Sequence, residues 1–287
     1  MGSLIGFYAF TRIINMLEAL QFEFMRNTLW AGLIVSLTCG VIGTFVVVNR
    51  IVFLSGGIAH AAYGGIGIAF FFGLPYMLGT LGFSLLIAMV MAAITLKVKN
   101  RSDTIIGVLW AIGMALGVIL LDLTPGYNVD LMSYLFGSIL AVPRSDLLLM
   151  FVMSSLILLT VWYFYNDFLV MSYDIEFAQI RGIPVRFLYF LLIGMVAISV
   201  VITIRVVGLI LVIALLTIPP CIAEKYSKSL FKMMLLSIGL SFLFTIVGLW
   251  LSYYFNLTAG ATIIMTAGTA FFISTIIDRL RFAWGKP

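Results

Sequence analysis

The chain holds a single histidine, His60, inside the glycine-rich stretch LSGGIAHAAYGGIGIAFFFG of residues 54–73. Imidazole is the commonest protein ligand for metals, so this side chain is the first candidate for chemistry. On a helix, residues three, four and seven positions away share a face. Around His60 these positions hold Phe53, Gly56, Gly57, Tyr63, Gly64 and Gly67. Because most of them are glycines, this face either lets another helix approach closely or leaves space for an ion beside the imidazole.

The elements that must hold His60 are membrane helices. Hydrophobic residues make up 63% of the 287 residues, charged residues make up 9%, and the mean hydropathy is +1.23. Such values lie outside the range of soluble domains. Apolar runs of about 20 residues recur, which is the length that a helix needs to cross a bilayer, and they lack the alternation of barrel strands. We therefore predict an all-α, polytopic membrane protein embedded in a lipid bilayer.

About nine spans, between eight and ten, are predicted from the apolar runs. They lie near residues 28–49, 57–74, 77–97, 104–122, 146–166, 186–204, 206–222, 231–253 and 257–277. The second and seventh spans are short and interrupted by glycine or proline, as in helices broken around a transport path. Residues 1–26 mix charged and apolar residues and are predicted to form an interfacial amphipathic helix, without a cleavable signal. Residues 27–287 then form a single transmembrane domain.

Lysine and arginine indicate the orientation. If the loop at Arg50 is cytoplasmic, twelve of the 16 basic residues fall on that side, and Arg12, Arg26, Arg144 and Arg205 fall on the other. Because positive residues concentrate in cytoplasmic loops, the N-terminus is predicted outside and the C-terminus in the cytoplasm. The net charge of +5 follows from this topology. The short basic clusters form no continuous patch, which argues against nucleic acid as a partner.

Three loops carry further signals. In residues 122–146 the apolar segment LMSYLFGSIL is predicted to dip into the membrane from outside. Residues 172–186, SYDIEFAQIRGIPVR, are predicted to form a cytoplasmic helical turn that ends at their glycine and proline. In residues 217–232, Pro219 and Pro220 are predicted to break the seventh span before a short polar helix. That helix is either a docking surface for a soluble partner or a solvated loop with basic anchors.

A second stripe of the glycine-rich helix is small at every fourth position, and its members are Gly57, Ala61, Gly65, Ala69 and Gly73. Such stripes let membrane helices pack closely, so we expect this one to face a neighbouring helix. A titratable side chain at membrane depth is costly unless it has a function or a partner. We therefore interpret His60, near the inner end of the second span, as a neutral imidazole ligand on an ion path. The alternative is a histidine that is hydrogen-bonded across a pair of helices.

Three stretches, in this order, are FLSGGIAHAAYGGIGIAF, EFAQIRGIPV and VVGLILVIALLTIPPCIAEKYSKSL. Together they resemble the permease subunits of ATP-binding cassette importers for zinc, manganese and related metals, over about residues 22–277. The resemblance implies a homodimeric core in the prokaryotic cytoplasmic membrane that moves a divalent zinc, manganese or iron ion inward. It also implies two cytoplasmic ATPase subunits and an extracytoplasmic metal-binding protein as partners. The chain has no G-x-x-x-x-G-K-[ST] loop, so it is expected to be a transporter subunit without covalent cofactor, whose ATP is hydrolysed by the partner.

The resemblance further implies which residues couple the chain to the ATPase. Residues 220–232 would form the coupling helix that sits in a groove of the ATPase. The residues expected to carry this contact are Pro220, Glu224, Lys225, Tyr226, Ser227 and Lys228.

The family commonly has an aspartate one helical turn before the histidine, where this sequence has Gly56. Zinc usually takes about four ligands, so one imidazole needs others. A second His60 across a dimer axis, main-chain carbonyls, water or the thiol of Cys39 are the candidates. A small buried core residue is the better reading of Cys39.

Two other functions compete with a metal-ion permease. A permease for a chelated metal, such as cobalamin or a siderophore, would need a wider external vestibule, and the match at residues 54–73 speaks against it. An intramembrane enzyme would need clustered ligands, but the sequence has no H-E-x-x-H motif and no second histidine. A single obvious ligand does not distinguish zinc from manganese or iron.

Overall fold

The computed structural model describes residues 23–97, 102–125, 137 and 142–284. Within these residues nine helices are long and apolar enough to cross a membrane, which confirms the all-α class and the predicted number of spans. The predicted interfacial helix of residues 1–26 lies almost entirely outside the described residues, and so does the LMSYLFGSIL segment apart from Gly137. The sides on which the two termini lie stay a prediction.

The spanning helices follow the predicted order, with ends shifted by a few residues. They are α2 (Glu23–Val48), α3 (Val52–Phe71), α4 (Tyr76–Lys97), α5 (Ser102–Asp122), α7 (Arg144–Tyr163), α10 (Val185–Val207), α11 (Leu209–Tyr226), α12 (Leu230–Phe255) and α13 (Ala259–Trp284). Two short helices, α8 (Tyr165–Tyr173) and α9 (Ile175–Ile180), connect α7 to α10. Helix α9 lies within residues 172–186, the segment that the sequence predicted to be a helical turn, whereas α8 precedes it.

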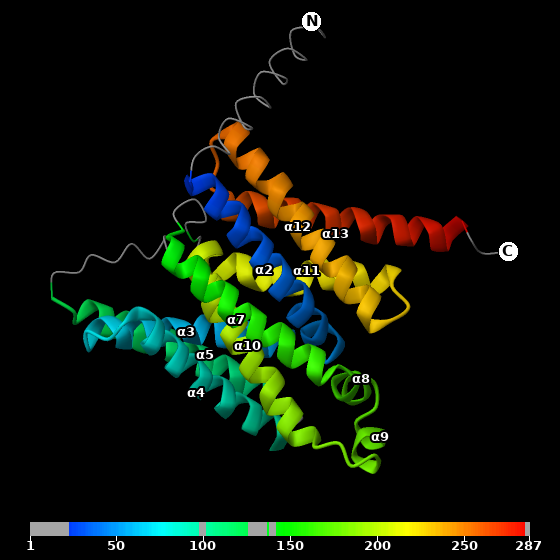
Figure 1. The fold of residues 1–287 in the computed structure, drawn as a ribbon, viewed down its shortest axis with the longest axis horizontal. Helices are drawn as coiled ribbons and strands as arrows, with labels where there is room; N and C mark the ends of the chain where they lie inside the picture. Colours follow the sequence, from blue (N-terminus) through cyan, green and yellow to red (C-terminus); the bar gives the residue numbers. More distant parts are fainter. Residues whose placement is uncertain (1–22, 98–101, 126–136, 138–141, 285–287) are drawn as a thin grey trace, which may run out of the picture.

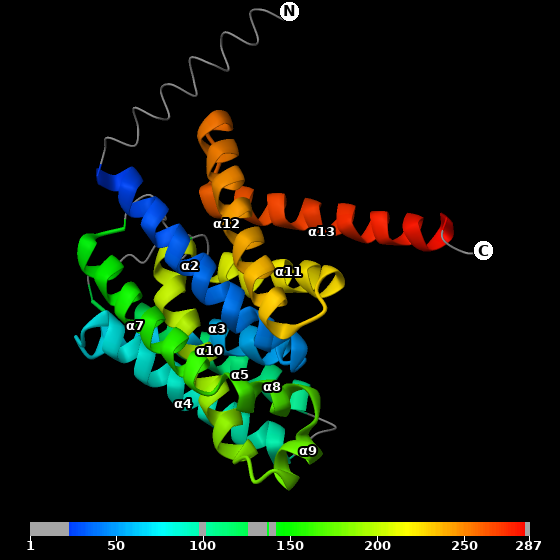
Figure 2. The same ribbon diagram turned by 45° about the vertical axis from the view of Figure 1, so that its right-hand side comes forward.

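The helices form two groups joined by a central set (Figures 1 and 2). At one side α3 packs against α4 and α5, while at the other side α12 and α13 pack against each other. Between them, α2 contacts α7, α11 and α12, and α10 contacts α3 and α4. In both views α13 extends away from the bundle toward the C-terminus. The histidine-bearing helix α3 is therefore enclosed by neighbours along most of its length.

The second and seventh spans are continuous helices, which corrects the prediction that they are interrupted. Helix α11 runs through Pro219 and Pro220, although proline cannot donate the hydrogen bond that the carbonyl four residues earlier would accept. Gly43 of α2 lies directly over this turn, since a Cβ built on it would come within 2.5 Å of the Leu216 carbonyl oxygen and 2.9 Å of Pro220 Cγ. In membrane helices, a neighbouring helix that covers the freed carbonyls makes an internal proline tolerable. The chain turns instead at Gly208, whose φ is 79°.

The small stripe of α3 packs as predicted. A Cβ built on Gly65 would lie 2.7 Å from Thr80 Cα in α4. A Cβ built on Gly113 of α5 would lie 2.9 Å from Ala61 Cα. Side chains at these glycines would force the backbones apart, so the small residues set the close spacing of α3, α4 and α5.

Candidate functional site

His60 lies near the middle of α3, as the ninth of its 20 residues. At about 1.5 Å per residue, its Cα is about 12 Å along the axis from Val52, the first residue of α3. The expected position near the inner end of the span is therefore wrong. The difference arises because α3 begins five residues before the predicted start, in the stretch VFLSG, which turns out to be helical. The imidazole is therefore carried by the middle of a helix that is long enough to span a membrane.

The imidazole of His60 stacks on the indole of Trp110 in α5. The ring centroids are 4.1 Å apart and the planes differ by 11°. The Nδ1 atom of His60 is buried and has no hydrogen-bond partner among the described residues. The interpretation of His60 as a histidine hydrogen-bonded across two helices thus finds no support at this atom. A buried imidazole nitrogen without a partner has a lone pair or a proton available for a ligand.

The face of α3 around His60 is open at only one of its glycines. A Cβ built on Gly56 would meet only Ile213 Cδ1 of α11, at 4.0 Å. By contrast, a Cβ on the adjacent Gly57 would come within 2.6 Å of Ile106 Cγ2. Gly64 is crowded by Phe83 Cε1 of α4 at 2.6 Å, and Gly67 is crowded by the Gly117 carbonyl oxygen of α5 at 2.6 Å. The space beside His60 therefore opens toward α11, at the position where the family has its aspartate.

Cys39 has the core role that the sequence favoured. Its side chain is completely buried in α2 and belongs to the main hydrophobic cluster. Helices α2 and α3 make only marginal contact with each other. Among the residues that the structure describes, no group of three or more His, Cys, Asp or Glu side chains could hold a metal ion. A metal at His60 would have to complete its coordination from outside this set.

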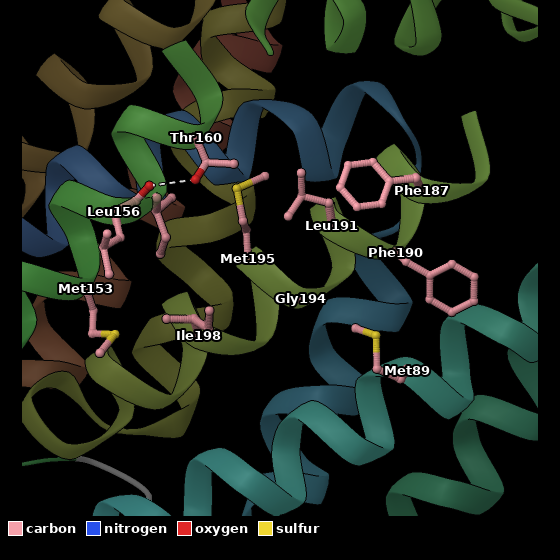
Figure 3. A pocket seen from close by; sticks show the side chains of 11 residues that line it. Met89, Met153, Leu156, Thr160, Phe187, Phe190, Leu191, Gly194, Met195 and Ile198 are labelled. Carbon is pink, nitrogen blue, oxygen red and sulfur yellow. Dashed lines mark hydrogen bonds between the residues drawn. The ribbon is translucent and has the colours of Figure 1, made fainter. Parts of the chain in front are cut away.

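A cavity of about 370 Å³ lies between α4, α7 and α10 and is shown in Figure 3. Its lining includes Met89, Met195 and Phe190 and is almost entirely apolar. The one lining hydroxyl, of Thr160, donates a hydrogen bond of 2.8 Å to the carbonyl of Leu156 in its own helix. His60 does not line this cavity. The cavity offers no ligands to an ion and is separate from the candidate metal path.

The polar end of α11 packs on α13 and forms no separate helix. Lys225 Nζ lies 3.1 Å from the Asp278 carboxylate and donates hydrogen bonds to Ser274 Oγ (3.1 Å) and Thr275 Oγ1 (2.9 Å). The hydroxyl of Tyr226 donates to the other carboxylate oxygen of Asp278, at 3.2 Å. The lysine also lies 5.3 Å above the Phe271 ring. Two of the residues expected to couple to the ATPase are thus engaged within the chain.

The other four expected coupling residues are distributed differently. Pro220 is buried against α2, and Glu224 and Lys228 are exposed. Ser227 is half-buried and begins the turn that leads to α12. The structure therefore does not gather the expected residues on one exposed helix.

Helix α9 is an exposed apolar feature within residues 174–182, the segment that the sequence indicates as the alternative place for the ATPase contact. Asp174 caps it by accepting a hydrogen bond of 2.9 Å from the Phe177 amide, and Gly182 ends the segment with a φ of 76°. Ile180 is 84% exposed, and Phe177 is also exposed. Large apolar side chains on a short, capped loop helix are typical of a contact surface. The apolar residues within the predicted cytoplasmic loop were the signal that could have identified it.

Among the described residues, the nine apolar helices define a polytopic membrane protein with a partly buried imidazole inside its bundle. The chain belongs to the ABC 3 transport family, whose model matches residues 21–278. This confirms the resemblance to ATP-binding cassette permeases drawn from the three sequence stretches. It also agrees with the predicted localisation as a multi-pass protein of a bacterial cytoplasmic membrane.

Similar proteins cover nearly the whole chain. An uncharacterized membrane protein of Synechocystis is 50% identical over 94% of this chain and 96% of its own length. The manganese transport system membrane protein MntC of Listeria innocua is 32% identical over 89% of this chain and 91% of its own length. The solved structure of PsaBC from Streptococcus pneumoniae in complex with Fab superposes with a TM-score of 0.83 at 33% identity, covering 91% of this chain and 95% of that one.

Proposed function

We propose that the chain is the permease of an ATP-driven importer that moves a divalent transition metal ion, with manganese ahead of zinc and iron, into the cytoplasm. The manganese transport name of the Listeria relative supports this order. The observation that carries the proposal is the His60 imidazole, which makes no hydrogen bond at its buried Nδ1, beside the uncrowded Gly56, where a built Cβ would meet only Ile213 Cδ1 at 4.0 Å. Two copies of the permease, two ATPase subunits and an extracytoplasmic metal-binding protein would complete the importer.

In this proposal His60 acts as a neutral ligand at mid-membrane. Manganese accepts oxygen ligands as readily as an imidazole, so water and main-chain carbonyls suit the remaining positions. A single fixed protein ligand holds an ion weakly, and weak binding favours release during transport. Gly56 leaves this position uncrowded, because a Cβ built there would meet only Ile213 Cδ1 at 4.0 Å.

The ATPase contact is placed at α9 in this proposal, in preference to the end of α11. Lys225 and Tyr226 are held by Asp278, so replacing them would disturb the chain itself. Ile180 and Phe177, in contrast, contribute little to the fold, since both are exposed. An exposed apolar side chain that enters a pocket of the partner is the usual centre of a protein contact. Glu224 and Lys228, both exposed, suit a polar rim of that contact.

Uptake of radioactive manganese into cells tests the role of His60. His60→Ala is expected to abolish uptake while the protein still inserts in the membrane and binds its ATPase, because alanine fits the small-residue surroundings. His60→Gln keeps a polar group but is a poor metal ligand, and it should also fail. Ser84→Ala in α4 is the matched control, since it removes a buried hydroxyl that has no hydrogen-bond partner in the described structure. Full uptake by His60→Gln would show that the histidine is a packing residue.

A further inference from the structure

His60 lacks the feature that usually orients a metal-binding histidine. In most metal sites the second ring nitrogen donates to a carboxylate, carbonyl or water, and this hydrogen bond fixes the tautomer and the ring orientation. No such protein partner of Nδ1 exists among the described residues. The imidazole must be oriented by another contact if it is to present a ring nitrogen in a fixed direction.

The stacked indole of Trp110 is the contact that can do this. With the ring planes only 11° apart, the indole covers one face of the imidazole and does not block the ring edge that carries the nitrogens. A metal binds in the plane of the imidazole, through the nitrogen lone pair, so the stack does not compete with coordination. It does hinder rotation of the imidazole about its χ2 angle.

The Trp110 side chain is itself held by a hydrogen bond and by an aromatic contact. Its indole N–H donates to Met114 Sδ, one turn further along α5, at 3.0 Å. Phe53 packs against it at a centroid distance of 6.2 Å, with the rings tilted by 53°. Phe53 precedes His60 by two turns on the same face of α3. The three aromatic rings therefore form a continuous row across α3 and α5.

The helices that carry the two stacked rings are also fixed relative to each other. Helices α3 and α5 share the most extensive contact in the described bundle. At Gly67 the backbones are so close that a Cβ would lie 2.6 Å from the Gly117 carbonyl oxygen. A sliding motion that separated the rings would have to break this glycine contact. The stack is therefore a permanent part of the α3–α5 pair.

We propose that Trp110 is a positioning residue for the metal ligand: it holds the His60 imidazole so that a ring nitrogen faces the space beside Gly56. The proposal rests on the proposed function, because it assigns a role toward the same ion. By keeping the imidazole in its binding orientation, the stack reduces the ordering that ion binding requires. The free energy of aromatic stacking corresponds to a change of about two- to tenfold in the affinity for Mn²⁺.

Binding of Mn²⁺ to the permease–ATPase complex in lipid nanodiscs tests this role. Pulsed EPR of bound Mn²⁺ detects the coupling of an imidazole nitrogen. Trp110→Leu retains an apolar side chain without a ring, and it is expected to weaken binding about two- to tenfold and to broaden the nitrogen coupling. Trp110→Phe retains a ring that can stack and should keep most of the affinity. Trp162→Leu is the matched control, because that indole is 77% exposed on α7, and it should change neither quantity.

The outcomes separate this proposal from the metal site itself. A folded Trp110→Leu protein with unchanged affinity and unchanged nitrogen coupling overturns the role of Trp110 and leaves His60 as a ligand. No nitrogen coupling in the unaltered complex overturns His60 as a ligand, and the role of Trp110 with it. If Trp110→Leu does not fold, Met114→Leu removes the sulfur acceptor and retains the side-chain volume. A broadened nitrogen coupling in that variant supports the proposal, and an unchanged coupling overturns it.

Discussion

Gly56→Asp gives the sharpest test of where the ion site lies. The variant introduces a carboxylate one helical turn before His60, on the same face of α3. The structure has room for it, because a Cβ at this position meets only Ile213 Cδ1 at 4.0 Å. Asp is also a slightly better helix residue than glycine, so the backbone itself is not weakened. We expect the protein to fold and to carry two metal ligands instead of one.

The expected gain in Mn²⁺ affinity follows from the cost of placing a carboxylate within a membrane helix. An aspartate near the middle of a membrane helix costs about 2.5 to 3.5 kcal/mol on insertion scales when nothing compensates its charge. A bound divalent ion removes this penalty by coordinating the carboxylate. If the whole penalty is recovered on binding, Mn²⁺ affinity rises by roughly sixty- to three-hundredfold, at about 1.4 kcal/mol per factor of ten. The same penalty should lower the thermal stability of the metal-free variant and let added Mn²⁺ restore it.

Mn²⁺ titration of the purified complex, with thermal unfolding in the presence and absence of EDTA, measures both effects. Gly57→Asp is the matched control, since its Cβ would come within 2.6 Å of Ile106 Cγ2. That control is expected to destabilise the protein without any gain from Mn²⁺. A folded Gly56→Asp protein that binds Mn²⁺ no more tightly than the natural sequence would refute the placement of the site between Gly56 and His60.

Two predictions concern the end of the molecule that the charge distribution predicts to be cytoplasmic. Ile180→Glu should prevent co-purification of the ATPase while the permease stays folded, because Ile180 is 84% exposed. The control Leu78→Glu, at a 66% exposed position near the start of α4, should leave co-purification of the ATPase intact. Lys225→Glu should lower the thermal stability of the permease, and adding Asp278→Lys should restore part of it, at about 1 kcal/mol for a partly exposed ion pair. Loss of the ATPase from a fully stable Lys225→Glu protein would place the contact back at the end of α11.

The class, the number of spans and the small stripe of α3 were predictable because they depend on local composition and period. A run of about 20 apolar residues usually forms one membrane-spanning helix in a bilayer. Small residues at every fourth position also identify the close-packing face of a helix, even when the partner helix is unknown. In the structure Gly65, on this face, packs on Thr80. The partner itself is a long-range property, so the sequence did not show that Trp110 of α5 would cover His60.

The two errors about α11 have the same physical origin. Prolines were expected to break the helix because of the hydrogen bonds that they remove within it. The turn that contains the prolines is instead covered by Gly43 of α2, far away in the sequence, which packs closely on the Leu216 carbonyl and on Pro220. Similarly, Lys225 was read as a surface charge, although its partner Asp278 lies in the last described helix. Both misreadings come from judging a side chain without the helix that lies against it.

The two sides of the proposed ion site differ in how they are anchored, and we expect the less firmly anchored side to move. His60 and Trp110 belong to α3 and α5, whose glycines bring the backbones into contact at Gly67. The opposite wall is Ile213 of α11, which meets the chain before it at Gly208, a residue with a φ of 79°. A glycine in this conformation joins two helices without a continuous hydrogen-bond ladder, so it is suited to absorb a change of angle. The far end of α11 is tied to α13 through Lys225, which would carry such a movement to α13. Release of an ion from His60 is therefore expected to involve displacement of α11 while the imidazole and its indole stay together.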